Sequence, residues 1–264
     1  MHKRIYGEKV TEVIFLGTNG WYDTNTGNTI CVLIKCDSYN IIFDAGNGFY
    51  KLDDYINKDN ETFLFLSHFH LDHIAGLHIL NKMKRVKNMK ILGPSGTKNV
   101  LNTIINSPFT IPVTQLPFPV EIHELPEEKG MLPFHAYSKP LRHSSLTLGY
   151  RIEADEKAVA YCPDTGYCEN AVDLSRNADL LIAECAYKSG QENPKWPHLN
   201  PESAARIANE AQANMLALVH FDASIYRTLE ERKEAEWQAQ KIFQNTFAAE
   251  DGMMIELSLS GRRR

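Results

Sequence analysis

Hydrophobic residues along the chain form short strand-like runs that alternate with stretches of helical periodicity. Runs rich in β-branched and aromatic residues that end in turn-forming residues are typical of strands. They predict strands at 12–17, 29–36, 40–46, 62–67, 89–93, 178–185, 215–221 and 252–259. Apolar positions spaced three and four residues apart are typical of amphipathic helices. They predict helices at 73–83, 95–106, 201–212 and 229–247.

Two further segments have patterns of their own. Residues 107–140 hold prolines at short intervals, which favours extended strands and loops because proline interrupts helices and central ladders. Residues 148–154 and 158–162 predict a hairpin that turns around Asp155–Lys157. Strands and helices thus alternate in both halves of the chain, and no Gly/Ser-rich linker divides it. We therefore expect one α/β domain over residues 1–264, with helices outside and sheets inside.

Composition and charge limit the class of protein. The chain is 43% hydrophobic and 23% charged, which is typical of a globular protein with a substantial core. Its formal net charge of -5 is not typical of a general nucleic-acid binder, although a local basic groove could bind nucleic acid. The basic residues at 261–264 are expected to be a solvated chain end.

Localisation and membrane contact follow from what the chain lacks. Its five cysteines are irregularly spaced, which does not indicate a disulfide framework. The first residues lack the long apolar core of a secretory signal, so we expect a cytoplasmic protein. No apolar run approaches the length of about 20 residues that spans a bilayer, so no membrane partner is expected.

The most informative motif is Ser-His-Phe-His-Leu-Asp-His at 67–73. It places three imidazoles and one carboxylate directly after a predicted buried strand. A loop that leaves the end of a strand can turn successive side chains into one pocket. Imidazole nitrogens and carboxylate oxygens are ligands that suit zinc and also manganese or iron. The motif therefore predicts a metal site.

This motif and four other segments, one before it and three after it, resemble a known family. His68-x-His70-x-Asp72-His73 resembles the HxHxDH signature of the metallo-β-lactamase superfamily. Four other segments carry the family's residues in the family's order. They are FDAGNG with Asp44 before the motif, and PLRHSS with His143, YCPDTG with Asp164 and LVHFD with His220 after it. The resemblance covers residues from about 12 to 221. It implies a four-layer αββα sandwich with metals between the upper edges of two sheets.

The resemblance also implies a site for two divalent metal ions, with zinc expected before manganese or iron. One ion would be held by His68, His70 and His143, and the other by Asp72, His73 and His220. Asp164 would bridge both ions, and Asp44 would lie behind them and orient an imidazole or a water. Asp72 is expected to act in catalysis as well as in metal binding.

Two segments nearer the end of the chain resemble one branch of the superfamily. Ribonuclease Z and related phosphodiesterases have segments that resemble two segments of this chain. The first is LLIAEC, which contains Glu184, and the second is PHLNPESAARIANEAQ, which contains His198. The resemblance implies that His198 is a catalytic acid, held charged by Glu184, and not a metal ligand. The preferred activity is cleavage of a small phosphodiester, such as a cyclic nucleotide or a nucleotide ester, by a metal-bridged hydroxide.

Three alternatives stay open. Ribonuclease Z carries a long Gly/Pro-rich arm that grips tRNA, and no such insert lies between Ser107 and His143, so tRNA 3′ processing is not favoured. A thioester, lactone or β-lactam hydrolase would use the same metals without needing the His198–Glu184 pair. A non-catalytic metal-binding module is the last choice, because the ligand set looks complete. Either a monomer or an oligomer fits the sequence.

Overall fold

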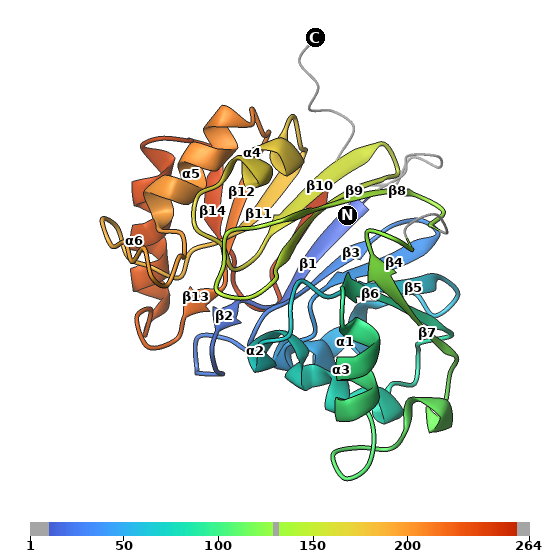
Figure 1. Ribbon diagram of the computed structural model, residues 1–264. Coiled ribbons are helices and arrows are strands. Elements are labelled where there is room, and N and C mark those ends of the chain that lie inside the picture. Colours follow the sequence, from blue (N-terminus) through green and yellow to red (C-terminus); the bar gives the residue numbers. More distant parts are fainter. Residues whose placement is uncertain (1–10, 129–131, 258–264) are drawn as a thin grey trace.

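The computed structural model describes residues 11–128 and 132–257. Two β-sheets lie face to face, and helices cover the outer face of each (Figure 1). The first residues of the chain, the basic end at 261–264 and the last two residues of the predicted closing strand lie outside the described ranges. No helix in these ranges is long and apolar enough to cross a membrane.

The first sheet has seven strands in the order β15-β1-β3-β4-β5-β6-β7. They are β1 (Thr11–Gly17), β3 (Cys31–Lys35), β4 (Tyr39–Phe43), β5 (Glu61–Phe65), β6 (Met89–Pro94), β7 (Val120–Leu125) and β15 (Met254–Leu257). The strands from β4 to β7 run parallel to one another. The short helices that follow these strands are η1 (Asn47–Lys51), α1 (Leu52–Tyr55), α2 (Leu71–Ile74), η2 (Ala75–Lys82), α3 (Thr97–Ile104) and η3 (Val113–Gln115).

The second sheet has six strands in the order β14-β12-β11-β10-β9-β8. They are β8 (His135–Pro140), β9 (Leu148–Ala154), β10 (Lys157–Cys162), β11 (Leu180–Glu184), β12 (Leu216–Val219) and β14 (Thr246–Ala248). Its helices are α4 (Glu169–Ser175), α5 (Pro201–Glu210) and α6 (Leu229–Gln240). A short parallel pair, β2 (Asn19–Gly20) with β13 (Phe221–Asp222), links the two halves of the chain.

Successive side chains along a strand point to opposite faces of its sheet, and this alternation separates the layers of the fold. In β1, Val13 and Phe15 point into the core between the sheets, whereas Ile14 and Leu16 point into the core beneath the outer helices. Because successive strand residues point to opposite faces, an apolar strand can fill two cores at once. The second sheet follows the same rule, and its outer face packs against α4, α5 and α6. The predicted α/β class and the four-layer αββα sandwich are therefore confirmed.

Most predicted elements are present within a few residues, but two helix predictions need correction. The helix predicted at 229–247 ends at Gln240, and Thr246–Ala248 forms β14 beside β12. Phe247 packs its ring against Phe15 of the other sheet at 5.9 Å, so a contact distant in sequence decides this segment. Within the helix predicted at 73–83, residues 75–82 form a 3-10 helix. There the chain passes so close to the loop after β4 that a Cβ on Gly76 would lie 2.2 Å from the carbonyl oxygen of Gly46.

A buried arginine joins α6 to the loop that follows β1. Arg232 is almost fully buried, and its guanidinium donates hydrogen bonds to Thr18 Oγ1 and Thr26 Oγ1, both at 2.9 Å, and to Asn19 Oδ1. The guanidinium also lies 4.7 Å from the centre of the Phe221 ring. Buried polar groups are costly unless they are paired, so Arg232 and its acceptors depend on one another.

We therefore predict that Arg232→Ala lowers the free energy of unfolding by about 3 kcal/mol, because it leaves several buried acceptors without a donor. The neighbouring residue Lys233 pairs with Glu236 at the surface, so Lys233→Ala should change the free energy of unfolding by less than about 0.5 kcal/mol. Urea denaturation of both variants, followed by circular dichroism, measures the difference. Equal unfolding midpoints in the two variants would contradict the prediction.

Candidate metal centre

Most of the predicted site residues come from loops at the ends of parallel strands. Asp44 follows β4, His68 follows β5, Asp164 follows β10 and His220 follows β12. Within each sheet these strands are parallel, so their carboxyl ends meet at one edge, which is where open α/β sheets place their binding sites. The structure brings together all seven predicted ligands there: His68, His70, Asp72, His73, His143, Asp164 and His220.

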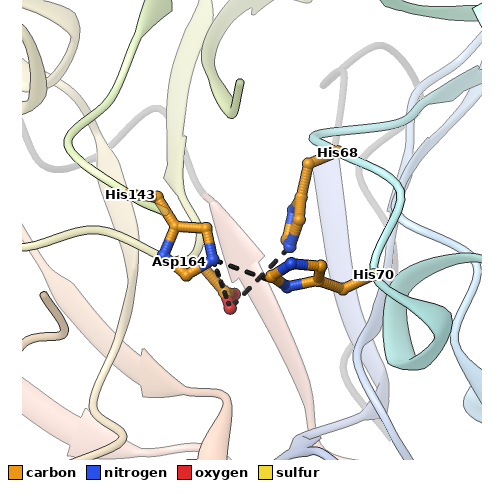
Figure 2. A group of neighbouring side chains, drawn as sticks. All are labelled: His68, His70, His143 and Asp164. Carbon is orange, nitrogen blue, oxygen red and sulfur yellow. Dashed lines mark hydrogen bonds and ion pairs between the residues drawn. The ribbon is translucent and has the colours of Figure 1, made fainter. Parts of the chain in front are cut away.

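One group of side chains consists of His68, His70, His143 and Asp164. Figure 2 shows the two histidines of the first sheet facing His143 and Asp164 of the second. One ligand atom from each lies within 4.8 Å of those of the others. Asp164 Oδ2 lies 3.9 Å from His68 Nε2 and 3.7 Å from His143 Nε2. These separations exceed hydrogen bonds and suit donors around a cation, since ligand atoms about 2.0–2.2 Å from a tetrahedral ion lie roughly 3.4 Å apart.

The second group consists of Asp72, His73 and His220. Asp72 Oδ2 lies 3.3 Å from His220 Nε2 and 3.7 Å from His73 Nε2. Asp164 faces this group with its other oxygen, because Oδ1 lies 3.0 Å from His73 Nε2 and 3.2 Å from His220 Nε2. The carboxylate of Asp164 thus stands between the two groups, with one oxygen turned toward each.

The chemistry of these donors fits divalent cations. His68 Nε2 is buried without a hydrogen-bond partner, although buried polar atoms are seldom left unpaired. Burial lowers the pKa of His143 to about 4 and that of His68 well below its usual value, so both are neutral near pH 7, as a ligand nitrogen must be. Burial opposes a charge on His73, but the carboxylates of Asp164 and Asp72 raise its pKa well above the usual value. The second group therefore attracts positive charge.

Asp44 lies directly behind His73. Its Oδ2 is 2.8 Å from His73 Nδ1 and accepts hydrogen bonds from the hydroxyls of Ser67 and Tyr161, both at 2.7 Å. Its Oδ1 accepts the backbone N–H of Ser67 at 2.7 Å. These contacts hold the ring of His73 with Nε2 toward Asp164. Ser67 and Tyr161 were not among the predicted site residues. Ser67 is the first residue of the motif at 67–73 and could have been identified there, but only the packing of the two sheets places Tyr161 here.

His198 and Glu184 form a buried pair at the edge of the ligand cluster. His198 Nδ1 lies 2.7 Å from Glu184 Oε1, and the same oxygen accepts the backbone N–H of Thr165 at 2.6 Å. His198 Nε2 is buried and has no hydrogen-bond partner. One ring nitrogen of His198 also lies within 4.8 Å of ligand atoms of Asp164 and His220. Burial disfavours the charged ring, but the Glu184 carboxylate outweighs it and raises the pKa of His198 to about 9.

Comparison with known proteins relates this geometry to a family. A model of the β-lactamase superfamily domain matches residues 39–221, which include every candidate ligand. Ribonuclease Z of Pyrococcus abyssi is 28% identical over 267 aligned positions, which cover 79% of this chain and 85% of that protein. The matched part of this chain is 79% of its 264 residues, which is about 209 residues and fewer than the 267 aligned positions. The relative therefore has residues within the matched region that have no counterpart here.

Two solved structures have the same fold. YhfI from Bacillus subtilis, a metallo-β-lactamase fold protein, superposes with a TM-score of 0.77 at 24% identity, over 94% of this chain and 99% of that one. The short form of human tRNase Z superposes with a TM-score of 0.74 at 23% identity, over 94% of this chain and all of that one. At these identities the likeness concerns the fold.

Proposed function

This chain belongs to the β-lactamase superfamily of metal-dependent hydrolases, and on that premise we propose that it hydrolyses a phosphodiester. The observation that carries the proposal is the His198–Glu184 pair, buried against the ligand cluster with His198 Nε2 unpartnered. An alkoxide is a poor leaving group, so cleavage of an alkyl phosphodiester gains from a positioned acid. The preferred substrates are small phosphodiesters, such as a cyclic nucleotide or a nucleotide ester.

We assign two divalent metal ions to the two groups of donors. His68, His70 and His143 would hold one ion, Asp72, His73 and His220 the other, and Asp164 would bridge them. When bound, the ions supply Lewis acidity at phosphorus and lower the pKa of water. Zinc fits this nitrogen-rich set first, and manganese or iron second.

The protein's own groups position and transfer protons. His198 protonates the departing oxygen, and Glu184 keeps the imidazole charged and oriented through the 2.7 Å contact with Nδ1. Asp72 serves as ligand and catalytic carboxylate, and the backbone N–H of Trp21 donates to its Oδ2 at 2.7 Å. Asp44 holds the ring of His73 from behind.

RNA is the second candidate substrate, because the similarity to ribonuclease Z covers 79% of the chain. Two observations favour a smaller substrate for this chain. Its net charge of -5 does not favour binding to a long phosphate backbone, and it lacks counterparts of some residues that the ribonuclease Z relative has. A thioester, lactone or β-lactam hydrolase is the third candidate, and it leaves the His198–Glu184 pair without a purpose.

A substrate panel tests the reaction class. We expect zinc- or manganese-loaded protein to hydrolyse cyclic and linear nucleotide phosphodiesters at least about 10-fold faster, by kcat/KM, than an acyl thioester, a lactone or a β-lactam. A precursor tRNA with a 3′ extension is included as the RNA substrate. Faster turnover of a carbon ester would refute the phosphodiesterase proposal, and selective 3′ cleavage of the tRNA would replace the small substrate with RNA.

Metal analysis tests the assigned ligands. We expect up to two equivalents of metal in the wild-type protein, and loss of metal from both groups in Asp164→Ala, because one carboxylate faces both. Asp44→Ala should keep part of the metal but lose activity, because the ring of His73 is no longer held from behind. Elemental analysis of dialysed protein measures both. Normal metal content and turnover in Asp164→Ala would show that it does not bridge.

The acid role of His198 is tested by changing the leaving group. Nitrophenolate leaves with little protonation, whereas an alkoxide needs a proton. His198→Ala should therefore slow cleavage of an alkyl phosphodiester by about 10²–10⁴-fold and slow nitrophenyl phosphodiesters much less. Glu184→Gln should show the same pattern more weakly, since Glu184 acts through the imidazole. Steady-state kinetics on both substrates and metal content are measured for each variant.

The exposed histidine His78 supplies the matched control, and His78→Ala should leave both rates near the wild-type values. Equal losses on the two substrates in His198→Ala would exclude an acid role. Loss of metal in that variant would make His198 a ligand, as its approach to Asp164 and His220 also allows.

A further inference from the structure

A stack of three aromatic rings runs from the metal centre to the surface. The indole of Trp196 lies nearly parallel to the imidazole of His70, with ring centres 6.4 Å apart and planes at 5°. The indole of Trp21 stacks on Trp196 in turn, with centres 6.1 Å apart and planes at 22°. Trp21 is 51% exposed, so the stack ends in an indole that is open to solvent. Neither indole has a part in the chemistry derived above, since Trp21 contributes there only through its backbone N–H.

The backbone holds Trp21 in an unfavourable conformation. Its φ of 68° lies in the left-handed region, which bulky residues rarely adopt and which costs about 1–3 kcal/mol. The surrounding loop is tightly fixed, because the Asn19 side chain donates to Tyr22 O at 3.1 Å and to Gly27 O at 2.9 Å. Arg232 holds Asn19 from beneath. The fold therefore holds an exposed indole in a strained backbone conformation, and strained backbone conformations are frequent at functional sites.

Two other large side chains near Trp21 in the chain or across its hydrogen bond are exposed. Tyr22, the next residue, is 50% exposed, and Leu71, the neighbour of the Asp72 that accepts the backbone N–H of Trp21, is 73% exposed. Exposed large apolar side chains beside a candidate reactive centre are typical of a recognition surface. Among recognition residues, tryptophan suits flat rings, since it offers a wide π-face at small entropic cost.

We infer that Trp21 and Trp196 form a stacking subsite for a planar heterocycle of the substrate, namely the nucleobase of a nucleoside phosphodiester. The inference rests on the proposed phosphodiesterase activity and specifies its substrate class. In this arrangement the phosphodiester lies at the ligands and the base stacks against the exposed indole of Trp21. Stacking accepts every base, because each one has a π-face, so the subsite selects nucleosides without selecting sequence.

Two chromogenic phosphodiesters with one leaving group isolate this subsite. They are the p-nitrophenyl ester of thymidine 5′-monophosphate and methyl p-nitrophenyl phosphate, which lacks the nucleoside. The readout is the preference, which is kcat/KM for the first divided by kcat/KM for the second. We expect Trp21→Ala to lower the preference about tenfold, mainly through KM, and Trp21→Phe to keep most of it. Trp196→Ala, in a different loop, should lower it as well.

The third tryptophan of the chain supplies the control. Trp237 is 54% exposed on α6, and its ring contacts the ammonium of Lys241 and not the aromatic stack, so Trp237→Ala should leave the preference at the wild-type value. Binding is measured separately from turnover by titrating the metal-loaded protein with thymidine 5′-monophosphate. Quenching of tryptophan fluorescence should occur in the wild type and Trp237→Ala and be lost in Trp21→Ala.

The outcomes separate the subsite from the proposed function. Quenching that depends on Trp21, without turnover of either phosphodiester, would support the subsite and refute the phosphodiesterase. An unchanged preference in both Trp21→Ala and Trp196→Ala would refute the subsite. A wild-type dimer that Trp21→Ala splits into monomers, again with unchanged preference, would show that this surface binds a second copy of the chain instead.

Discussion

Three carboxylates at the junction of the two sheets, two of them buried and one partly buried, require compensating positive charge, and most of the site is built around that requirement. Asp44, Asp72 and Asp164 all act on His73, which lies in the middle of them. Burying charge in a poorly polarisable interior is costly unless it is paired. The imidazoles that face these carboxylates include neutral ones with free nitrogens, so the cluster suits divalent cations better than protons.

The site also joins the two sheets mechanically. Asp44 belongs to the first sheet and accepts a hydrogen bond from Tyr161 of the second, while Asp164 of the second sheet faces histidines of the first. Close packing leaves these groups little freedom. A Cβ on Gly20 would lie 2.6 Å from Cε1 of His220, so glycine is required where β2 passes the second group of donors. A rigid frame of this kind suits catalysis that depends on the positions of charges.

Our proposals assign chemistry and recognition to two sets of residues. The first set is the metal donors with His198 and Glu184, and the second is Trp21 and Trp196, although His198 and Trp196 lie in the same loop between β11 and α5. Related hydrolases can share the first set and differ in the second, because function resides in sites placed on a common fold.

The sequence by itself determined what depends on local pattern. Alternating and near-continuous apolar runs indicated the strands, and the loop with His68, His70, Asp72 and His73 is one uninterrupted motif whose neighbours in the chain are neighbours in space. The resemblance to the metallo-β-lactamase superfamily added His143, Asp164 and His220, and the structure brings their side chains together with those of the motif.

Tertiary structure alone decided the features that depend on distant partners. The helix predicted at 229–247 includes Thr246 and Phe247, but these residues lie in β14, since Phe247 gains more from packing on Phe15 across the sheets than from local helix propensity. The contact of Tyr161 with Asp44 spans 117 residues, and the stack of Trp21 on Trp196 joins two loops that are far apart in the chain. Neither has a local signature, because side-chain contacts between remote segments exist only once the two sheets have packed.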